Sequence, residues 1–296
     1  MIPFILLYAS LVNDVRGLIA QHNEAAADQA VRAYQAKSGA TPELAAAISW
    51  LARDELAAKR YDKAEAYAAQ CRTMAIQLLG SRRLDSDEWL TTALGASIEV
   101  HAQALAAEGR RAEAVGFLLE QIQSFSDTSI GERLHKNLNL LSLEGKPAPP
   151  IATNEWLGPK PEPLAALRGH PVLLFFWAHW CPDCKAMVPT LADIEKTYGP
   201  KGLVLIGPTE RYGYAAGGAP ATPEEERQYI ERVRRQYYAS LATMPVPVSQ
   251  ASFKAYGAST TPTVVLVDSQ GVVRLYHPGA LTERELTEGI EALTRK

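Results

Sequence analysis

Cys181 and Cys184 are the residues in this sequence best suited to chemistry, because only two residues separate them in the stretch Trp-Cys-Pro-Asp-Cys-Lys. Such a pair can bind a metal, close a structural disulfide or exchange electrons through thiol–disulfide chemistry. The third cysteine, Cys71, has no evident mate, and we predict that it is a buried apolar residue of a helical region. Three cysteines are too few for a fold that is held together by disulfides.

The metal and the structural interpretations both lack support in the sequence. A tetrahedral zinc site needs four ligands, and the pair supplies only two. No second cysteine pair exists, no His-x-x-x-His pattern follows, and His179 is expected to point away from Cys184. A structural disulfide over this gap would close a very short loop, which restrains little of the unfolded chain. We therefore predict neither a metal nor a bound cofactor at this site.

The position of the pair favours redox exchange. A buried strand is predicted before Cys181, and a helix is predicted over residues 182–197. The unpaired N–H groups and the dipole at the start of this helix would stabilise a thiolate on Cys181. Cys184 follows one helical turn later and is expected to be more buried. The pattern therefore predicts Cys181 as the nucleophile and Cys184 as the resolving cysteine, and it requires the Cys181 sulfur to be accessible.

The elements that must position the pair alternate between strands and helices. Apolar runs indicate buried strands, Thr222 is a predicted N-cap, and the turn at 268–271 predicts a hairpin. The predicted strands are 172–177, 203–206, 263–267 and 272–276, with a short extended stretch at 246–248, and the predicted helices are 182–197, 223–241 and 281–293. This order indicates an α/β domain with a mixed sheet.

The first half of the chain has a different character. Residues 13–143 are rich in alanine, and Pro42 is the only proline among them, so we predict an all-α domain. Thr41 is the predicted N-cap of a helix in which Pro42 occupies the first turn. A proline-rich junction at 145–150 indicates that a second domain begins near residue 144 and continues to residue 296.

Two segments of the helical half, residues 60–64 and 110–114, resemble the second helix of a tetratricopeptide repeat. Their offset of 50 residues differs from the usual period of about 34, so a generic helical bundle is the alternative. Helix pairs of this kind more often bind partners than perform chemistry. A protein partner of the helical domain is therefore expected.

Charge and the N-terminal segment bear on partners and location. The 296 residues carry a net charge of -3, which gives no electrostatic reason to expect nucleic acid as a partner. Residues 1–12 form an apolar run that is too short to span a bilayer. They have the length of a signal-peptide core but lack the positively charged residues that usually precede it. Two interpretations are open: an export signal or its remnant, or the first turns of a buried helix.

Residues 176–185 resemble the active site of the thioredoxin superfamily. Pro189 resembles the helix-kinking proline of that family, and Thr261-Pro262 resembles the loop that carries its cis-proline. The resemblance implies a thioredoxin fold, which is a mixed central sheet with flanking helices. It also implies that Trp180, Thr261 and Pro262 contact the substrate, with the backbone of Thr261 offering hydrogen bonds to an incoming peptide.

Residues 145–149 and 164–169, followed by the apolar strand, resemble the TlpA-like branch of the superfamily. The resemblance covers residues 144–296. It implies a thiol–disulfide oxidoreductase that acts on protein thiols or disulfides, with another thiol protein as electron donor or acceptor. It also implies a periplasmic or membrane-associated location, with the cytoplasm as the alternative.

Two positions depart from the family pattern. Phe175 replaces the buried aspartate of thioredoxin, and Met187 replaces a glutamate of many TlpA-like proteins, so the proton acceptor for Cys184 is open. Asp183 is one substitute, although an exposed carboxylate is screened. His179 is expected to be exposed, and the Gly-rich segment 211–220 is expected to be a surface loop, with a flap over the site as the alternative.

Two other functions compete with this interpretation. A peroxiredoxin-type peroxidase normally has threonine or serine three residues before its cysteine, where this sequence has Ala178. A partner-binding scaffold with a vestigial redox fold would not require the intact cysteine pair.

Overall fold

The computed structural model describes residues 10–294. The chain divides into two compact units between Asn137 and Leu138. The predicted export segment at residues 1–12 falls mainly on residues 1–9, which lie outside the described residues. From residue 10 to residue 294, no helix combines the length and the apolar character that crossing a membrane requires.

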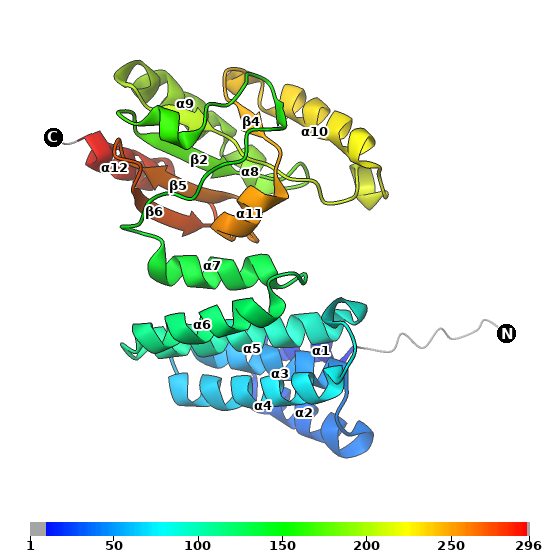
Figure 1. The fold of residues 1–296 in the computed structure, drawn as a ribbon. Coiled ribbons are helices and arrows are strands. Elements are labelled where there is room, and N and C mark those ends of the chain that lie inside the picture. The colour runs from blue at the N-terminus through cyan, green and yellow to red at the C-terminus, as the bar shows by residue number, and fades with distance from the viewer. Residues whose placement is uncertain (1–9, 295–296) are drawn as a thin grey trace. The chain divides into compact units, whose positions relative to one another are not determined.

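In the described part of the first unit, from residue 10 onward, every element of secondary structure is a helix (Figure 1). Its helices are α1 Leu11–Ala20, α2 Glu24–Ser38, α3 Pro42–Ala57, α4 Tyr61–Leu79, α5 Glu88–Ala107, α6 Arg111–Phe125 and α7 Gly131–Ser142, with a 3₁₀ turn at Leu84–Ser86. The helix α7 continues across the division between the units. The predicted N-cap at Thr41 is confirmed, because its hydroxyl accepts a hydrogen bond of 3.1 Å from the N–H of Leu44.

Alanine allows the central helices α3, α4 and α5 to pack closely against one another. Ten of the buried alanines on these helices are Ala45, Ala46, Ala47, Ala52, Ala64, Ala68, Ala75, Ala93, Ala96 and Ala102. Cys71 is buried among these helices, as predicted, and its thiol donates to the carbonyl oxygens of Ala45 at 3.1 Å and Ala93 at 3.3 Å.

The second unit contains a four-stranded mixed sheet with the order β3-β2-β5-β6. Its strands are β2 Val172–Phe176, β3 Val204–Ile206, β5 Thr263–Val267 and β6 Val273–Pro278, and a separate antiparallel pair joins β1 Trp156–Leu157 to β4 Val246–Pro247. The strand β3 is parallel to β2, while β5 and β6 are antiparallel to their neighbours. The predicted hairpin is confirmed as β5 and β6.

Helices cover both faces of this sheet (Figure 1). They are α8 Pro182–Ala186, α9 Val188–Tyr198, α10 Pro223–Tyr237, α11 Gln250–Tyr256 and α12 Glu283–Thr294, with 3₁₀ turns at Leu164–Leu167, Gly199–Lys201, Ala216–Gly218 and Ala239–Leu241. Side chains of β2 alternate between the two faces: Leu173 and Phe175 join the core beneath α9, α10 and α12, whereas Leu174 and Phe176 join the core beneath α11. This burial on both faces explains why β2 is a continuous apolar run.

Capping residues begin two charged helices of this unit, and the one at Thr222 is where the sequence predicts it. Thr222 and Glu225 form a reciprocal capping box at the start of α10, and Thr282 and Glu285 exchange the same pair of hydrogen bonds at the start of α12. These caps satisfy backbone N–H groups that have no partner inside the helix.

Candidate active site

The cysteine pair lies just beyond the end of β2, where the chain enters α8. Cys181 is the N-cap of α8, and a disulfide joins it to Cys184 with a Cα–Cα distance of 5.3 Å. The backbone N–H of Cys184 lies 3.0 Å from the Cys181 sulfur and donates to it. A sulfur that carries negative charge at this position would therefore accept a hydrogen bond from the first turn of the helix.

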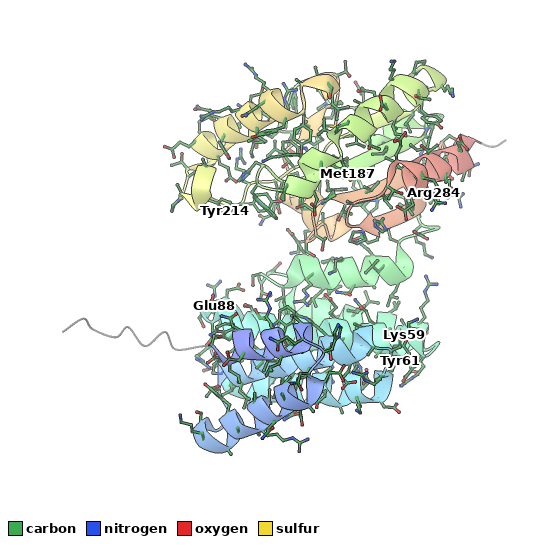
Figure 2. All side chains as sticks on the ribbon, turned by 180° about the vertical axis from the view of Figure 1, so that it is seen from behind. Lys59, Tyr61, Glu88, Met187, Tyr214 and Arg284 are labelled. Carbon is green, nitrogen blue, oxygen red and sulfur yellow. A yellow bond between two sulfur atoms is a disulfide. The ribbon has the colours of Figure 1, made fainter. Side chains whose placement is uncertain are left out.

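The single helix predicted over residues 182–197 is wrong in one respect, since the structure has two helices. The helix α8 ends at Ala186, and α9 begins at Val188 (Figure 2 labels Met187 between them). Pro189 explains the break, because it has no N–H to donate to the carbonyl of Lys185 and its ring would clash there. The short helix α8 therefore carries Cys184 separately from the longer helix.

A second loop meets the disulfide from far along the chain. The peptide bond between Thr261 and Pro262 is cis, and the carbonyl oxygen of Thr261 lies 3.4 Å from the Cys181 sulfur. The antiparallel pairing of β2 with β5 explains this proximity, since Thr263 pairs with Phe176. The structure thus brings the Thr261-Pro262 loop to the cysteine pair, as the resemblance to the thioredoxin superfamily implies.

The expectation that the Cys181 sulfur is accessible is wrong for this oxidised state. Cys181 is only 1% exposed and Cys184 is fully buried. The disulfide holds the Cys181 side chain inward, and the Thr261 carbonyl lies against its sulfur. The neighbouring Trp180, in contrast, is 46% exposed, so the surface of the site is an aromatic ring rather than a sulfur atom.

The surroundings of Cys184 are apolar. Phe175 and Met187, the two positions at which the family pattern has carboxyl groups, belong to the same buried cluster as Cys184. Asp183 is exposed at the start of α8. The chain therefore has no carboxyl group at either of the positions where the family pattern would supply a proton acceptor.

His179 is buried, so the expectation of an exposed side chain is wrong. Its residue exposure is 1%, and its Nε2 lies 3.3 Å from Oε1 of Glu226, which is equally buried. Burial lowers the pKa of His179 below its usual value, although the Glu226 carboxylate opposes this shift. A neutral ring must carry its proton on Nε2 in order to donate to the carboxylate, which leaves Nδ1 as an acceptor.

Glu226 is a site residue that the sequence reasoning missed. The signal was present, because Glu226, Ile230 and Val233 share one helical face of α10, and the two apolar residues are buried. The carboxylate also accepts hydrogen bonds from the backbone N–H groups of Tyr212 at 2.6 Å and Gly213 at 2.9 Å. Glu226 therefore connects the loop after β3 to the segment that precedes Cys181.

A thioredoxin-like domain is defined by this fold and this site, and the corresponding family model matches residues 163–294. The predicted fold class, an α/β thioredoxin fold preceded by an all-α region, is confirmed.

Similar proteins align with about half of the chain. The thioredoxin-like protein YneN of Bacillus subtilis is 27% identical over 149 residues, which are 50% of this chain and 79% of that protein. The thiol-disulfide oxidoreductase ResA of Bacillus thuringiensis is 26% identical over 152 residues, covering 51% of this chain and 78% of ResA. The solved thioredoxin-like protein SPOA0173 is 22% identical, with a TM-score of 0.41 over 51% of this chain and 97% of that structure. Residues 163–294 therefore form a thioredoxin-like domain, and about half of the chain is similar to proteins that are named thiol-disulfide oxidoreductases.

Proposed function

We propose that this protein exchanges disulfides with protein substrates through Cys181 and Cys184. The observation that carries the proposal is the disulfide at the start of α8, which lies against the carbonyl of Thr261. A metal role would leave two of four ligand positions empty, and no cluster of three or more metal-binding side chains occurs in residues 10–294. A purely structural bridge of this length would add little stability.

The exchange reaction proceeds in two steps from the reduced enzyme. The Cys181 thiolate attacks one sulfur of the substrate disulfide, forms a mixed disulfide and releases the other substrate sulfur as a thiolate, which takes up a proton. Cys184 loses its proton and attacks the Cys181 sulfur, which forms the enzyme disulfide and releases the second substrate thiol. Two electrons pass to the substrate, and each step reverses when the enzyme acts as an oxidant.

Trp180, Thr261 and Pro262 would contact the substrate. The carbonyl of Thr261 can accept a hydrogen bond from a peptide N–H, and its position beside the Cys181 sulfur would hold that peptide next to the reacting atom. Trp180 offers an exposed aromatic face beside the disulfide. Because Cys181 is 1% exposed, a substrate must displace neighbouring groups before its sulfur can approach.

The location and the partners follow from the same proposal. Another thiol protein would restore the reduced or the oxidised form of the pair, and the helical unit would bind a protein partner. The resemblance to the TlpA-like branch supports a periplasmic or membrane-associated location. Fractionation of cells that express the full chain would test that location, with recovery in the cytoplasm as the contrary result.

Trapping tests the proposed mechanism directly. In a Cys184→Ser variant the mixed disulfide cannot be resolved, so we expect Cys181 to remain covalently bound to substrate proteins. These complexes should appear as bands of higher mass on a non-reducing gel and should disappear after reduction.

The matched control is the double variant Cys181→Ser, Cys184→Ser, which keeps Cys71 as its only cysteine. It should form no such complexes. Equal trapping by the double variant would show that the attacking sulfur is not Cys181, and the absence of complexes with the single variant would contradict the mechanism.

A further inference from the structure

The loop of residues 211–221, which follows β3, is fastened beside the cysteine pair by one buried carboxylate. Glu226 is 1% exposed and accepts three hydrogen bonds, from the N–H groups of Tyr212 and Gly213 and from the His179 ring. Tyr212 and Gly213 belong to the loop, whereas His179 lies two residues before Cys181. The carboxylate therefore joins the loop to the segment that carries the nucleophile.

Aromatic contacts reinforce this connection. The His179 ring meets the rings of Tyr212, Tyr214 and Tyr229 edge to face, with centroid distances of 5.6, 5.4 and 5.2 Å. Tyr212 also meets Trp180 edge to face at 5.6 Å, and it packs against the buried cluster that contains Cys181. Contacts of this geometry are favourable beyond the area that they bury.

The rest of the loop is held mainly by hydrogen bonds within the loop itself. Gly213, Gly217 and Gly218 have positive φ angles, and the loop closes on itself through the hydrogen bonds Ala215 N–H to Ala219 and Ala221 N–H to Gly213. The base is held by Arg211, which donates to the Pro223 carbonyl at 3.1 Å and pairs with Glu155. Between Arg211 and the exposed tip, the Glu226 carboxylate is the principal polar anchor.

From these contacts we infer that Glu226 is a positioning residue, which holds Tyr212 against Trp180 so that the two rings form one wall of the substrate-binding surface. The inference rests on the proposed function and specifies its substrate class. We expect the enzyme to prefer disulfides in polypeptides to small-molecule disulfides. A polypeptide can bind to the Thr261 backbone while its sulfur reacts at Cys181. Such a polypeptide would contact Trp180, because Trp180 directly precedes Cys181 in the chain. A small disulfide needs no such wall.

Proteolysis measures the anchoring without relying on activity. Trypsin cleaves after arginine, and the Arg211–Tyr212 bond lies beside the two N–H groups that Glu226 holds. In a Glu226→Gln variant, the amide keeps only one acceptor oxygen, so Tyr212 or Gly213 loses its partner. We expect trypsin to cleave this bond about tenfold faster in the variant than in the wild type. Mass spectrometry of the fragments measures the rate.

The control is Glu224→Gln, which changes an exposed residue on the same turn of α10 whose carboxylate accepts from Gln228. Its cleavage rate should match that of the wild type. Equal cleavage rates in the wild type and in Glu226→Gln would overturn the anchoring role.

Kinetics measure the effect on substrate choice. For Glu226→Gln we expect KM for a polypeptide disulfide to rise about tenfold with kcat unchanged, while the rate with a small aromatic disulfide stays within about twofold of wild type. Tyr212→Ala should reproduce the rise in KM, because it removes the ring that meets Trp180. This variant tests the same inference if Glu226→Gln does not fold.

Three results would overturn the inference about substrate choice. They are an unchanged KM in both variants, equal losses with large and small substrates, and a fall in kcat alone. A wild-type protein without exchange activity would instead overturn the proposed function, and the proteolysis comparison would still decide the role of Glu226.

Discussion

Replacing Cys181 with serine is expected to lower the rate of disulfide exchange by at least about 10³-fold, because a serine hydroxyl is not ionised at neutral pH and cannot form a mixed disulfide. The reduction of a protein disulfide by the variant, with a dithiol as electron donor, measures this loss. The effect is large because the nucleophile itself is removed, whereas a substrate contact such as Trp180 only affects binding. A variant that keeps the wild-type rate would rule out Cys181 as the attacking group.

Cys71 provides the matched control for this substitution. It is fully buried in the helical unit, and burial raises the pKa of its thiol to about 12, so it stays protonated at neutral pH. The Cys71→Ala variant should therefore keep the exchange rate within about twofold, provided that circular dichroism shows it to be folded. A large loss of activity in a folded Cys71→Ala protein would mean that the helical unit contributes to the chemistry.

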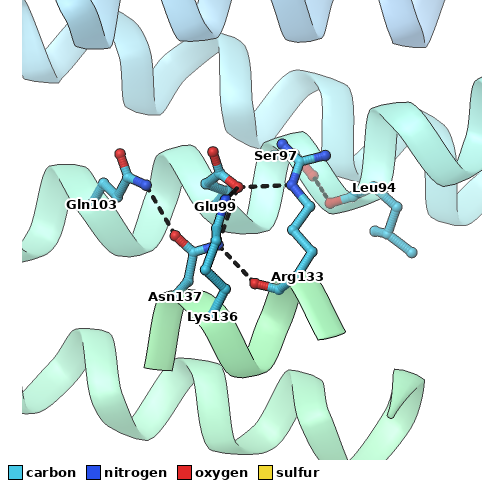
Figure 3. Close-up of polar contacts among 7 residues, drawn as sticks. All are labelled: Leu94, Ser97, Glu99, Gln103, Arg133, Lys136 and Asn137. Atoms are coloured by element: carbon cyan, nitrogen blue, oxygen red, sulfur yellow. Dashed lines mark hydrogen bonds and ion pairs between the residues drawn. The ribbon is translucent and has the colours of Figure 1, made fainter. Parts of the chain in front are cut away.

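The second large effect is expected in the helical unit, where Glu99 on α5 binds three residues of α7 (Figure 3). Its Oε2 accepts hydrogen bonds from Arg133 at 2.7 Å, Asn137 at 3.1 Å and Lys136 at 3.3 Å. The Glu99 side chain is only 18% exposed, and Arg133 and Lys136 are similarly shielded. Removing the charge of Glu99 would leave two cations together without their shared partner.

The pKa of Glu99 gives the size and the pH dependence of this effect. Burial raises the pKa, but Arg133 and Lys136 lower it more strongly, from 4.5 to about 2. The difference corresponds to roughly 3 kcal/mol of folding free energy. Because the folded pKa is the lower one, this contribution is complete above pH 4.5 and is lost as the pH falls from 4.5 towards 2.

Hydrogen exchange of the full chain tests this prediction. At pH 7 we expect Glu99→Gln to reduce the protection of amides in α5 and α7 by roughly 100-fold relative to wild type. At pH 3 the difference should be less than half as large in free energy, because the wild-type carboxylate has by then lost most of its advantage. Glu113→Gln, which breaks an exposed pair with Arg110, should leave the protection nearly unchanged. A Glu99→Gln effect of the same size at both pH values would contradict the assigned cause.

Elements that depend only on neighbouring residues could be predicted from the amino-acid sequence. The apolar run of β2, the spacing of Cys181 and Cys184, and the helix start at Thr222 are all local patterns, and the structure contains each of them. Such features follow from the sequence because strand burial, the reach across one helical turn and the capping of N–H groups involve only a few adjacent residues.

The exposure of the reacting sulfur and the burial of particular charged residues depend instead on contacts between distant segments, so the sequence did not predict them. Cys181 is buried because Thr261, 80 positions further along the chain, lies against it. Glu226 meets His179 across 47 positions, and Glu99 meets Arg133 across 34. Contacts between segments so far apart depend on how strands pair and how helices pack, and a charged residue such as Glu226 has the same local pattern whether its helix face meets solvent or the core.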